Sequence, residues 1–143
     1  MSDTYERSSD IPDNVRNVLV IMTDQHRTDT IGCLGNPHAQ TPVIDEMGRN
    51  GFAFTNCFTP TAICTPARAS LLTGKRPGKH LVLANPEWNI AYQTMIPLGT
   101  WTYTQALRDA GYNVGIVGKY HCGANLPDKF GADDDTYWGA ENP

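Results

Sequence analysis

Short apolar runs that end at polar residues constrain the fold of this chain more than any other feature of its sequence. Residues 18–22 are continuously apolar and rich in β-branched side chains, a pattern typical of a strand buried on both faces of a parallel sheet. Residues 52–58 and 113–117 are predicted to form two further strands. Helices are predicted over 42–49, over 66–72 and after Thr100.

Strands that alternate with helices predict an α/β fold in which a mainly parallel sheet lies between layers of helices. Thr41 and Thr100 are expected to cap the first and third helices, and Gly74 is expected to end the second. Residues 75–99 are rich in Pro and Gly and are predicted to form a loop over the site. The polar residues 1–16 are predicted to form a flexible leader, with an ordered domain over 17–143.

Length and charge limit the classes of function. The 143 residues are enough for one domain with its own core, and the net charge of -4 argues against a nucleic-acid surface. No apolar run approaches the roughly 20 residues that cross a bilayer, so no membrane span is expected. The acidic N-terminus lacks the features of a signal peptide, so a cytoplasmic location is expected. The four cysteines form no Cys-x-x-Cys pair and are expected to remain thiols.

Polar residues follow two of the predicted strands. Asp24 comes shortly after the first strand, and Lys119 and His121 follow the third. Ligands of such sheets bind beyond the carboxyl ends of the strands, so these side chains are expected to converge. Taken singly, each has an ordinary alternative: Asp24 as a turn residue, Lys119 as a surface charge and His121 as a satisfied polar group.

Cys64 is predicted to lie at the start of the second helix, whose first turn contains Pro66. Free backbone N–H groups and the positive end of the helix dipole should face this position, which suits an anion. Arg68 lies four residues later on the same helix face, where its planar fork could hold an oxyanion. A buried cysteine beside a surface arginine is the plainer reading. A thiolate nucleophile is a third reading, although cysteine phosphatases have a longer, Gly-containing loop between Cys and Arg.

Several segments of the chain resemble those of one enzyme family. The residues from Cys64 to Gly74 resemble the sulfatase signature, in which Pro and Arg follow the Cys at two and four residues and Leu-Thr-Gly ends the motif. Residues 111–123, centred on Gly-Lys-Tyr-His, resemble the second signature of the same family, and residues 41–45 and 51–56 are similar to the segments between them. The motifs follow the family order over nearly all of residues 17–123.

The resemblance implies an alkaline-phosphatase-like α/β fold, of which this chain would be the N-terminal portion, and hydrolysis of sulfate esters. It further implies that a formylglycine-generating enzyme oxidises Cys64 to formylglycine, with Pro66 and Arg68 in the recognition sequence. One hydroxyl of the hydrated aldehyde would attack the ester, and the other would lose its proton so that the adduct collapses. Lys119 would bring positive charge to the ester oxygens, and His121 would hydrogen-bond to the hydrated aldehyde.

A divalent metal is also implied by the resemblance. Asp24, Gln25 and the formylglycine at Cys64 would be its ligands, with calcium expected and manganese as the alternative. Many sulfatases carry a second acid where this chain has Gln25, a departure that is reminiscent of the choline-sulfatase and phosphonate monoester hydrolase branches. The expected substrate is therefore a small sulfate ester, with a phosphonate or phosphate ester as the alternative.

The length of the chain leaves a further alternative. Family members carry a later Asp-Asn or Asp-His metal pair, and no further strand–helix unit is predicted here after His121. We therefore expect a fragment of a longer enzyme or a non-catalytic, truncated anion-binding domain. An incomplete sheet would expose an edge and an apolar face, so the isolated chain is expected to aggregate or to associate into homo-oligomers.

Overall fold

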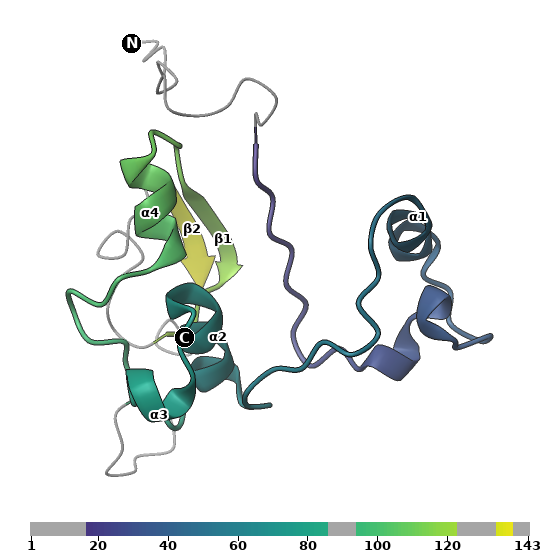
Figure 1. Cartoon of the computed structure of the whole chain (residues 1–143), viewed down its shortest axis with the longest axis horizontal. Helices are drawn as coiled ribbons and strands as arrows, with labels where there is room; N and C mark the ends of the chain where they lie inside the picture. The colour runs from purple at the N-terminus through teal and green to yellow at the C-terminus, as the bar shows by residue number, and fades with distance from the viewer. Residues whose placement is uncertain (1–16, 86–93, 123–133, 139–143) are drawn as a thin grey trace. The chain divides into compact units, whose positions relative to one another are not determined.

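The computed structural model describes residues 17–85, 94–122 and 134–138 (Figure 1), and the predicted leader 1–16 lies outside them. The chain divides into two compact units. One comprises Leu19–Phe58, and the other comprises Thr59–Pro143 together with Met1–Val18. The first unit contains the 3-10 helices η1 (Thr28–Thr30) and η2 (Gly32–Leu34) and the helix α1 (Pro42–Asn50). The second contains the helices α2 (Cys64–Thr73), α3 (Pro77–His80) and α4 (Tyr103–Asp109) and the strands β1 (Gly115–Lys119) and β2 (Asp134–Trp138).

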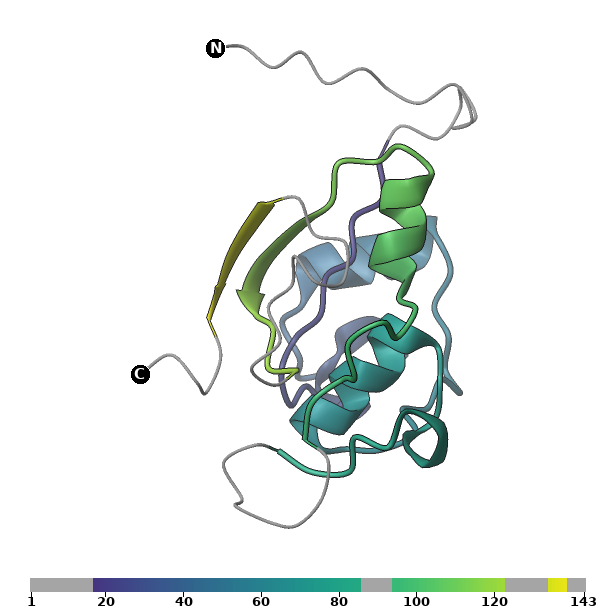
Figure 2. The same ribbon diagram turned by 90° about the vertical axis from the view of Figure 1, so that its left-hand side faces the viewer.

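Strands β1 and β2 of the second unit form a parallel pair in which Gly115 lies opposite Asp134 and Lys119 opposite Trp138 (Figures 1 and 2). The strand predicted over 113–117 is therefore present but lies two residues later, because pairing with β2 continues through Lys119. No further strand–helix unit was predicted after His121, and the strand β2 was therefore missed. This strand was not predicted because it begins with two aspartates, and Asp is depleted in strands.

Helix α2 confirms the helix predicted over 66–72 and extends it by two residues at its start and one at its end. Gly74 ends the helix in the left-handed conformation, with φ of 65°, as the sequence predicted. The hydroxyl groups of Ser70 and Thr73 donate to the carbonyl oxygens four residues earlier, at 2.9 and 2.7 Å. Two polar side chains can therefore be buried on this helix without loss of hydrogen bonds.

The third predicted helix is present as α4, but its N-cap differs. Thr102, and not Thr100, occupies the cap position, and its hydroxyl accepts a hydrogen bond from the Gln105 N–H at 3.3 Å. Both threonines precede the helix in sequence, so composition alone could not separate them. The Thr102 hydroxyl also lies 2.8 Å from that of Thr104, which fixes the entry of the chain into α4.

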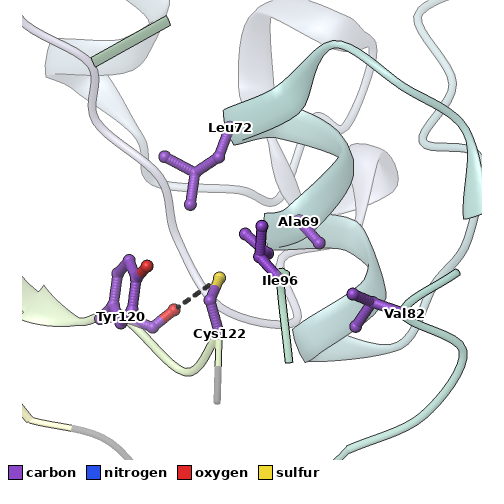
Figure 3. Packing of buried hydrophobic residues seen from close by; sticks show 6 residues of the cluster. All are labelled: Ala69, Leu72, Val82, Ile96, Tyr120 and Cys122. Atoms are coloured by element: carbon purple, nitrogen blue, oxygen red, sulfur yellow. Dashed lines mark hydrogen bonds between the residues drawn. The ribbon is translucent and has the colours of Figure 1, made fainter. Parts of the chain in front are cut away.

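The core of the second unit joins α2 to segments from later in the chain. In Figure 3, the side chains of α2 face those that follow β1 and those of residues 82 and 96; the cluster comprises Ala69, Leu72, Val82, Ile96, Tyr120 and Cys122. Residues 75–99 were predicted to be a loop over the site. Their described part instead contains α3 and supplies two of these core side chains, while residues 86–93 lie outside the described part.

The unit Leu19–Phe58 confirms the helix predicted over 42–49 as α1. Thr41 precedes this helix, but its hydroxyl does not cap it: it accepts the Gly32 N–H and donates to Asp45, each at 2.9 Å. Asp45 also accepts the Cys33 N–H at 2.7 Å, and this hydrogen bond is the main cause that lowers the pKa of the Asp45 carboxyl. Thr41 and Asp45 thus tie η2 to the first turn of α1.

The strands predicted over 18–22 and 52–58 are not formed in the described structure, where these segments have no ladder partner. Their side chains are exposed, with Leu19 at 82% and Phe52 at 92% of full exposure. Apolar, β-branched composition favours a strand only when a neighbouring strand supplies the other half of the hydrogen bonds. Among the described residues, no helix is long and apolar enough to cross a membrane.

Candidate active site around Cys64

Cys64 is the first residue of α2 and is half-buried, while the next two residues, Thr65 and Pro66, are buried. The residue before the helix, Ile63, has no side chain that can cap it. The Thr65 N–H is instead satisfied from a distance, by the side-chain oxygen of Asn85 at 3.0 Å. This arrangement holds the helix start firmly and leaves the positive end of the α2 dipole beside Cys64.

Lys119 brings a positive charge to Cys64. Its Nζ atom lies 3.7 Å from the Cys64 Sγ atom, although the two residues are 55 positions apart in the sequence. Lys119 is the last residue of β1, so the end of this strand places the lysine beside Cys64. An ammonium group and a helix N-terminus therefore meet at the same side chain, which favours negative charge there.

Arg68 is part of the same cluster but has a different partner from the one that the sequence suggested. Its Nη1 atom donates a hydrogen bond to the carbonyl oxygen of Lys119 at 2.5 Å. The guanidinium therefore ties α2 to the end of β1, and this bond holds the backbone that presents the Lys119 ammonium to Cys64. The predicted contact of Arg68 with an oxyanion remains a prediction.

His121 follows the Lys119 strand end and is only 2% exposed. Its backbone has a φ of 49°, in the left-handed region that side chains other than glycine rarely adopt. Such strain persists where the surrounding structure fixes the residue, and it is concentrated at functional sites. The structure thus buries His121 at a sharp backbone turn two residues from Lys119.

Asp24 and Gln25 belong to the other compact unit, Leu19–Phe58, so their predicted role as metal ligands beside Cys64 remains a prediction. Gln25 also has a left-handed backbone, with φ of 49°. Calcium requires about six to eight oxygen ligands. Nowhere in the described ranges do three or more His, Cys, Asp or Glu residues gather as a metal site would need. The three predicted ligands, Asp24, Gln25 and the formylglycine at position 64, would therefore leave further coordination positions of calcium to other donors.

Two residues that support the site were not predicted from the sequence. His80 is 3% exposed, and its ring nitrogens contact Ser70 and Val82. No spacing in the sequence marks this histidine, because the folding of α3 against α2 buries its ring. Asn85 was not singled out, since an Asn before a Pro is an ordinary turn signal. Its hydrogen bond to the start of α2 joins residues 20 positions apart, so no local sequence pattern predicts it.

The cysteines remain thiols, as expected. Cys122 is fully buried in the core of the second unit and donates to the Tyr120 carbonyl oxygen at 3.4 Å. Cys33 and Cys57 are exposed on the other unit. Of the four, Cys64 alone lies at the start of an α-helix beside an ammonium group.

Comparison with known proteins gives a consistent result. The family model described as Sulfatase matches residues 16–142. Human arylsulfatase D is 34% identical over 114 residues, which are 76% of this chain and 19% of that protein. Human arylsulfatase A is 34% identical over 110 residues, which are 75% of this chain and 21% of that protein.

Two solved structures agree with this result at the level of the fold. The putative sulfatase yidJ from Bacteroides fragilis has a TM-score of 0.63 and 31% identity, covering 72% of this chain and 22% of that one. BT4656, solved in complex with its substrate D-glucosamine-2-N,6-O-disulfate, has a TM-score of 0.64 and 30% identity, covering 76% of this chain and 20% of that one. The chain thus spans about a fifth of the length of the relatives it matches.

Proposed function

Because this chain belongs to the sulfatase family and shares its α/β fold, we propose that the protein hydrolyses sulfate esters with a nucleophile formed from Cys64. The observation that carries the proposal is the position of Cys64 at the start of α2, with the Lys119 Nζ atom 3.7 Å from its Sγ atom. A sulfate ester gains negative charge on its oxygens as it is attacked, and this site offers positive charge from two sources.

The matured residue is formylglycine in this proposal. Its hydrated aldehyde supplies one hydroxyl for attack on sulfur and a second whose deprotonation releases the sulfate. The residues of the chain then have separate tasks. Lys119 neutralises charge on the ester oxygens, and Arg68 keeps Lys119 in place through its backbone carbonyl. His121 is proposed to hydrogen-bond to the aldehyde hydrate, which its burial beside the strand end supports.

A divalent cation is part of the proposal, with Asp24, Gln25 and the side chain at position 64 among its ligands. Calcium is the expected ion and manganese the alternative, since both accept hard oxygen donors. Among the described residues, no group of three or more His, Cys, Asp or Glu side chains completes such a site. Calorimetric titration of each ion into the protein and into Asp24→Asn tests the ligand assignment, and equal affinities in the two would reject it.

A small sulfated molecule is the proposed substrate class. BT4656, with 30% identity to this chain, was solved with a sulfated sugar as its substrate, and two of the curated relatives are human arylsulfatases. Phosphonate esters are the second candidate, because Gln25 stands where many sulfatases carry a second acid, a departure reminiscent of the phosphonate monoester hydrolase branch. A phosphonate monoester carries one negative charge, as a sulfate monoester does.

The proposal is tested by producing the protein together with a formylglycine-generating enzyme and analysing the peptide that contains position 64 by mass spectrometry. The expected result is an aldehyde in that peptide and hydrolysis of a nitrophenyl sulfate that disappears in Cys64→Ala. Cys57→Ala, which changes an exposed cysteine of the other unit, serves as the matched control. An unmodified thiol together with undiminished turnover in Cys64→Ala would overturn the mechanism, and preferential cleavage of the phosphonate analogue would select the second substrate class.

A further inference from the structure

His80 is a buried histidine whose two ring nitrogens are both hydrogen-bonded. The Val82 N–H donates to Nδ1 at 3.1 Å, and Nε2 lies 2.9 Å from the Ser70 hydroxyl oxygen. A ring nitrogen that accepts an N–H carries no proton, so the proton of the neutral imidazole is on Nε2. The Nε2–H group therefore donates to the Ser70 hydroxyl oxygen.

The hydrogen-bond chain continues from Ser70 into the first turn of α2. The Ser70 hydroxyl has one proton to donate, and it donates this proton to the Pro66 carbonyl oxygen at 2.9 Å. His80, Ser70 and Pro66 are all buried, so water does not readily replace these bonds. Each hydrogen bond therefore has a defined donor: the Val82 N–H donates to His80, His80 donates to Ser70, and Ser70 donates to the Pro66 carbonyl oxygen. Pro66 lies two residues after Cys64.

Asn85 holds the same turn from a second point. Its side-chain oxygen accepts the Thr65 N–H at 3.0 Å, and both partners are buried. Between His80 and Asn85, the backbone of Leu81 adopts a φ of 63°. This left-handed turn is unfavourable for leucine, and it allows the next N–H, that of Val82, to reach the ring of His80.

We infer that His80 is a positioning residue for the turn that carries Cys64, and that it acts through Ser70 on the Pro66 carbonyl. The inference rests on the proposed function only in taking Cys64 as the reactive residue. Since the chain of hydrogen bonds requires an unprotonated Nδ1, the positioning depends on proton uptake by His80. If Nδ1 were protonated, it would be a donor opposite the Val82 N–H, which is also a donor. The first hydrogen bond of the series would then be lost.

The charges around His80 oppose that proton. Burial is the larger cause that lowers the pKa of His80, and the positive charge of Lys75 is the second. Residues 59–85 contain no Asp or Glu to stabilise an imidazolium, and their charged groups besides the histidine are all cations: Arg68, Lys75, Arg76 and Lys79. Helix α4, which also packs on α2, brings Arg108 and Asp109. The chain of hydrogen bonds is therefore intact at neutral pH and is lost under acidic conditions.

Three variants test the individual hydrogen bonds that link His80 to Pro66. His80→Gln places a side-chain N–H near the position of Nε2 and takes up no proton, so it should retain the bond to Ser70. His80→Leu removes both ring contacts. Ser70→Ala leaves the bond between Val82 and His80 but disconnects Pro66. All are made in the full chain without the maturation enzyme, so that position 64 remains a cysteine, and circular dichroism confirms that each variant is folded.

The first measurement is nitrogen NMR of the His80 ring. The expected spectrum at neutral pH has the proton on Nε2 and none on Nδ1. The opposite tautomer would overturn the inference, because His80 could then not accept from Val82 and donate to Ser70.

The second measurement is the rate at which a small alkylating reagent modifies Cys64 relative to exposed Cys33, resolved by peptide mass spectrometry. In the wild type we expect this ratio of rates to rise about fivefold as His80 takes up a proton at lower pH. The loss of one buried hydrogen bond should raise the equilibrium constant for opening of the Cys64 turn by about this factor. His80→Gln should show no such rise, whereas His80→Leu and Ser70→Ala should have the raised ratio already at neutral pH. A ratio that is independent of pH in the wild type, or that rises equally in His80→Gln, would overturn the inference. Neither measurement requires ester hydrolysis, so failure of the proposed function would leave both results readable.

Discussion

The Arg68 side chain is bound to the backbone, and not to the side chain, of Lys119: its Nη1 atom lies 2.5 Å from the Lys119 carbonyl oxygen. The bond therefore survives any change of the lysine side chain. Arg68→Ala should lower the free energy of unfolding by about 1.5 to 3 kcal/mol, the usual contribution of a hydrogen bond from a charged group. Lys119→Met should change it by no more than about 0.5 kcal/mol. Urea denaturation of both variants checks this difference, and equal losses would contradict the tether.

The same pair of variants separates stability from catalysis. In the matured protein, Lys119→Met should reduce kcat for a nitrophenyl sulfate by about a hundredfold, because it removes a charge aimed at the reacting group. Steady-state kinetics of the protein at its full natural length measures the effect. A variant with ordinary stability and undiminished kcat would show that the 3.7 Å contact with Cys64 has no part in the reaction.

Gly74 ends α2 with φ of 65° and has open space where a Cβ atom would lie. Gly74→Ala should therefore destabilise the protein by about 1 kcal/mol through backbone strain and not through a clash. Gly78, in α3, also has open space but no positive φ. Gly78→Ala should be neutral or stabilising by about 0.5 kcal/mol, because alanine restricts the unfolded chain. Thermal unfolding of the pair is the measurement, and a loss at both positions would argue for a steric cause.

Asn85 caps α2 in place of the missing cap at Ile63. Asn85→Ala should cost about 1 kcal/mol of stability, as for the loss of an N-cap. Asn85→Asp keeps an acceptor of nearly the same shape and adds a negative charge near the helix N-terminus, so it should retain most of the stability. Hydrogen exchange at the Thr65 amide checks the local effect. Equal protection in Asn85→Ala and the wild type would show that the bond does not form in solution.

The stability of the protein should depend on pH through His80. Its pKa is lowered in the folded state by burial and by Lys75, so between the folded and unfolded pKa values the unfolded chain binds more protons. The contribution is therefore fully present above the unfolded value of about 6.5 and is lost as the pH falls toward the lower folded value. Urea denaturation in this range should show a weaker pH dependence for His80→Gln than for the wild type. Identical slopes would contradict the assignment.

Local signals in the sequence predicted the helices well. Pro42, Gly51 and Gly74 mark ends of α1 and α2, and Pro66 lies in the first turn of α2, because each acts on the backbone at its own position. The strands were predicted less well, since a strand requires a partner that local sequence does not specify. Residues 18–22 have the stronger strand composition but no ladder partner in the described structure, whereas β2 opens with two aspartates and is paired.

The residues of the candidate site also divide into those that local sequence predicts and those that depend on long-range contacts. Cys64, Arg68 and Lys119 could be found because the first two lie on one helix turn and the third at a strand end. The roles of the supporting residues could not be found. The partner of Arg68 is a backbone carbonyl 51 residues away, and His80 contacts Ser70 only because α3 folds back on α2.

The sequence separations of these contacts also indicate an order of folding. The bonds of Ser70 with His80 and of Thr65 with Asn85 close loops of 10 and 20 residues, whereas the contacts of Lys119 with Arg68 and Cys64 span 51 and 55. Closing the longer loops costs more chain entropy and is slower. The turn that carries Cys64 is therefore expected to be structured before Lys119 arrives. During synthesis, which proceeds from the N-terminus, the supports of this turn would leave the ribosome before the lysine does.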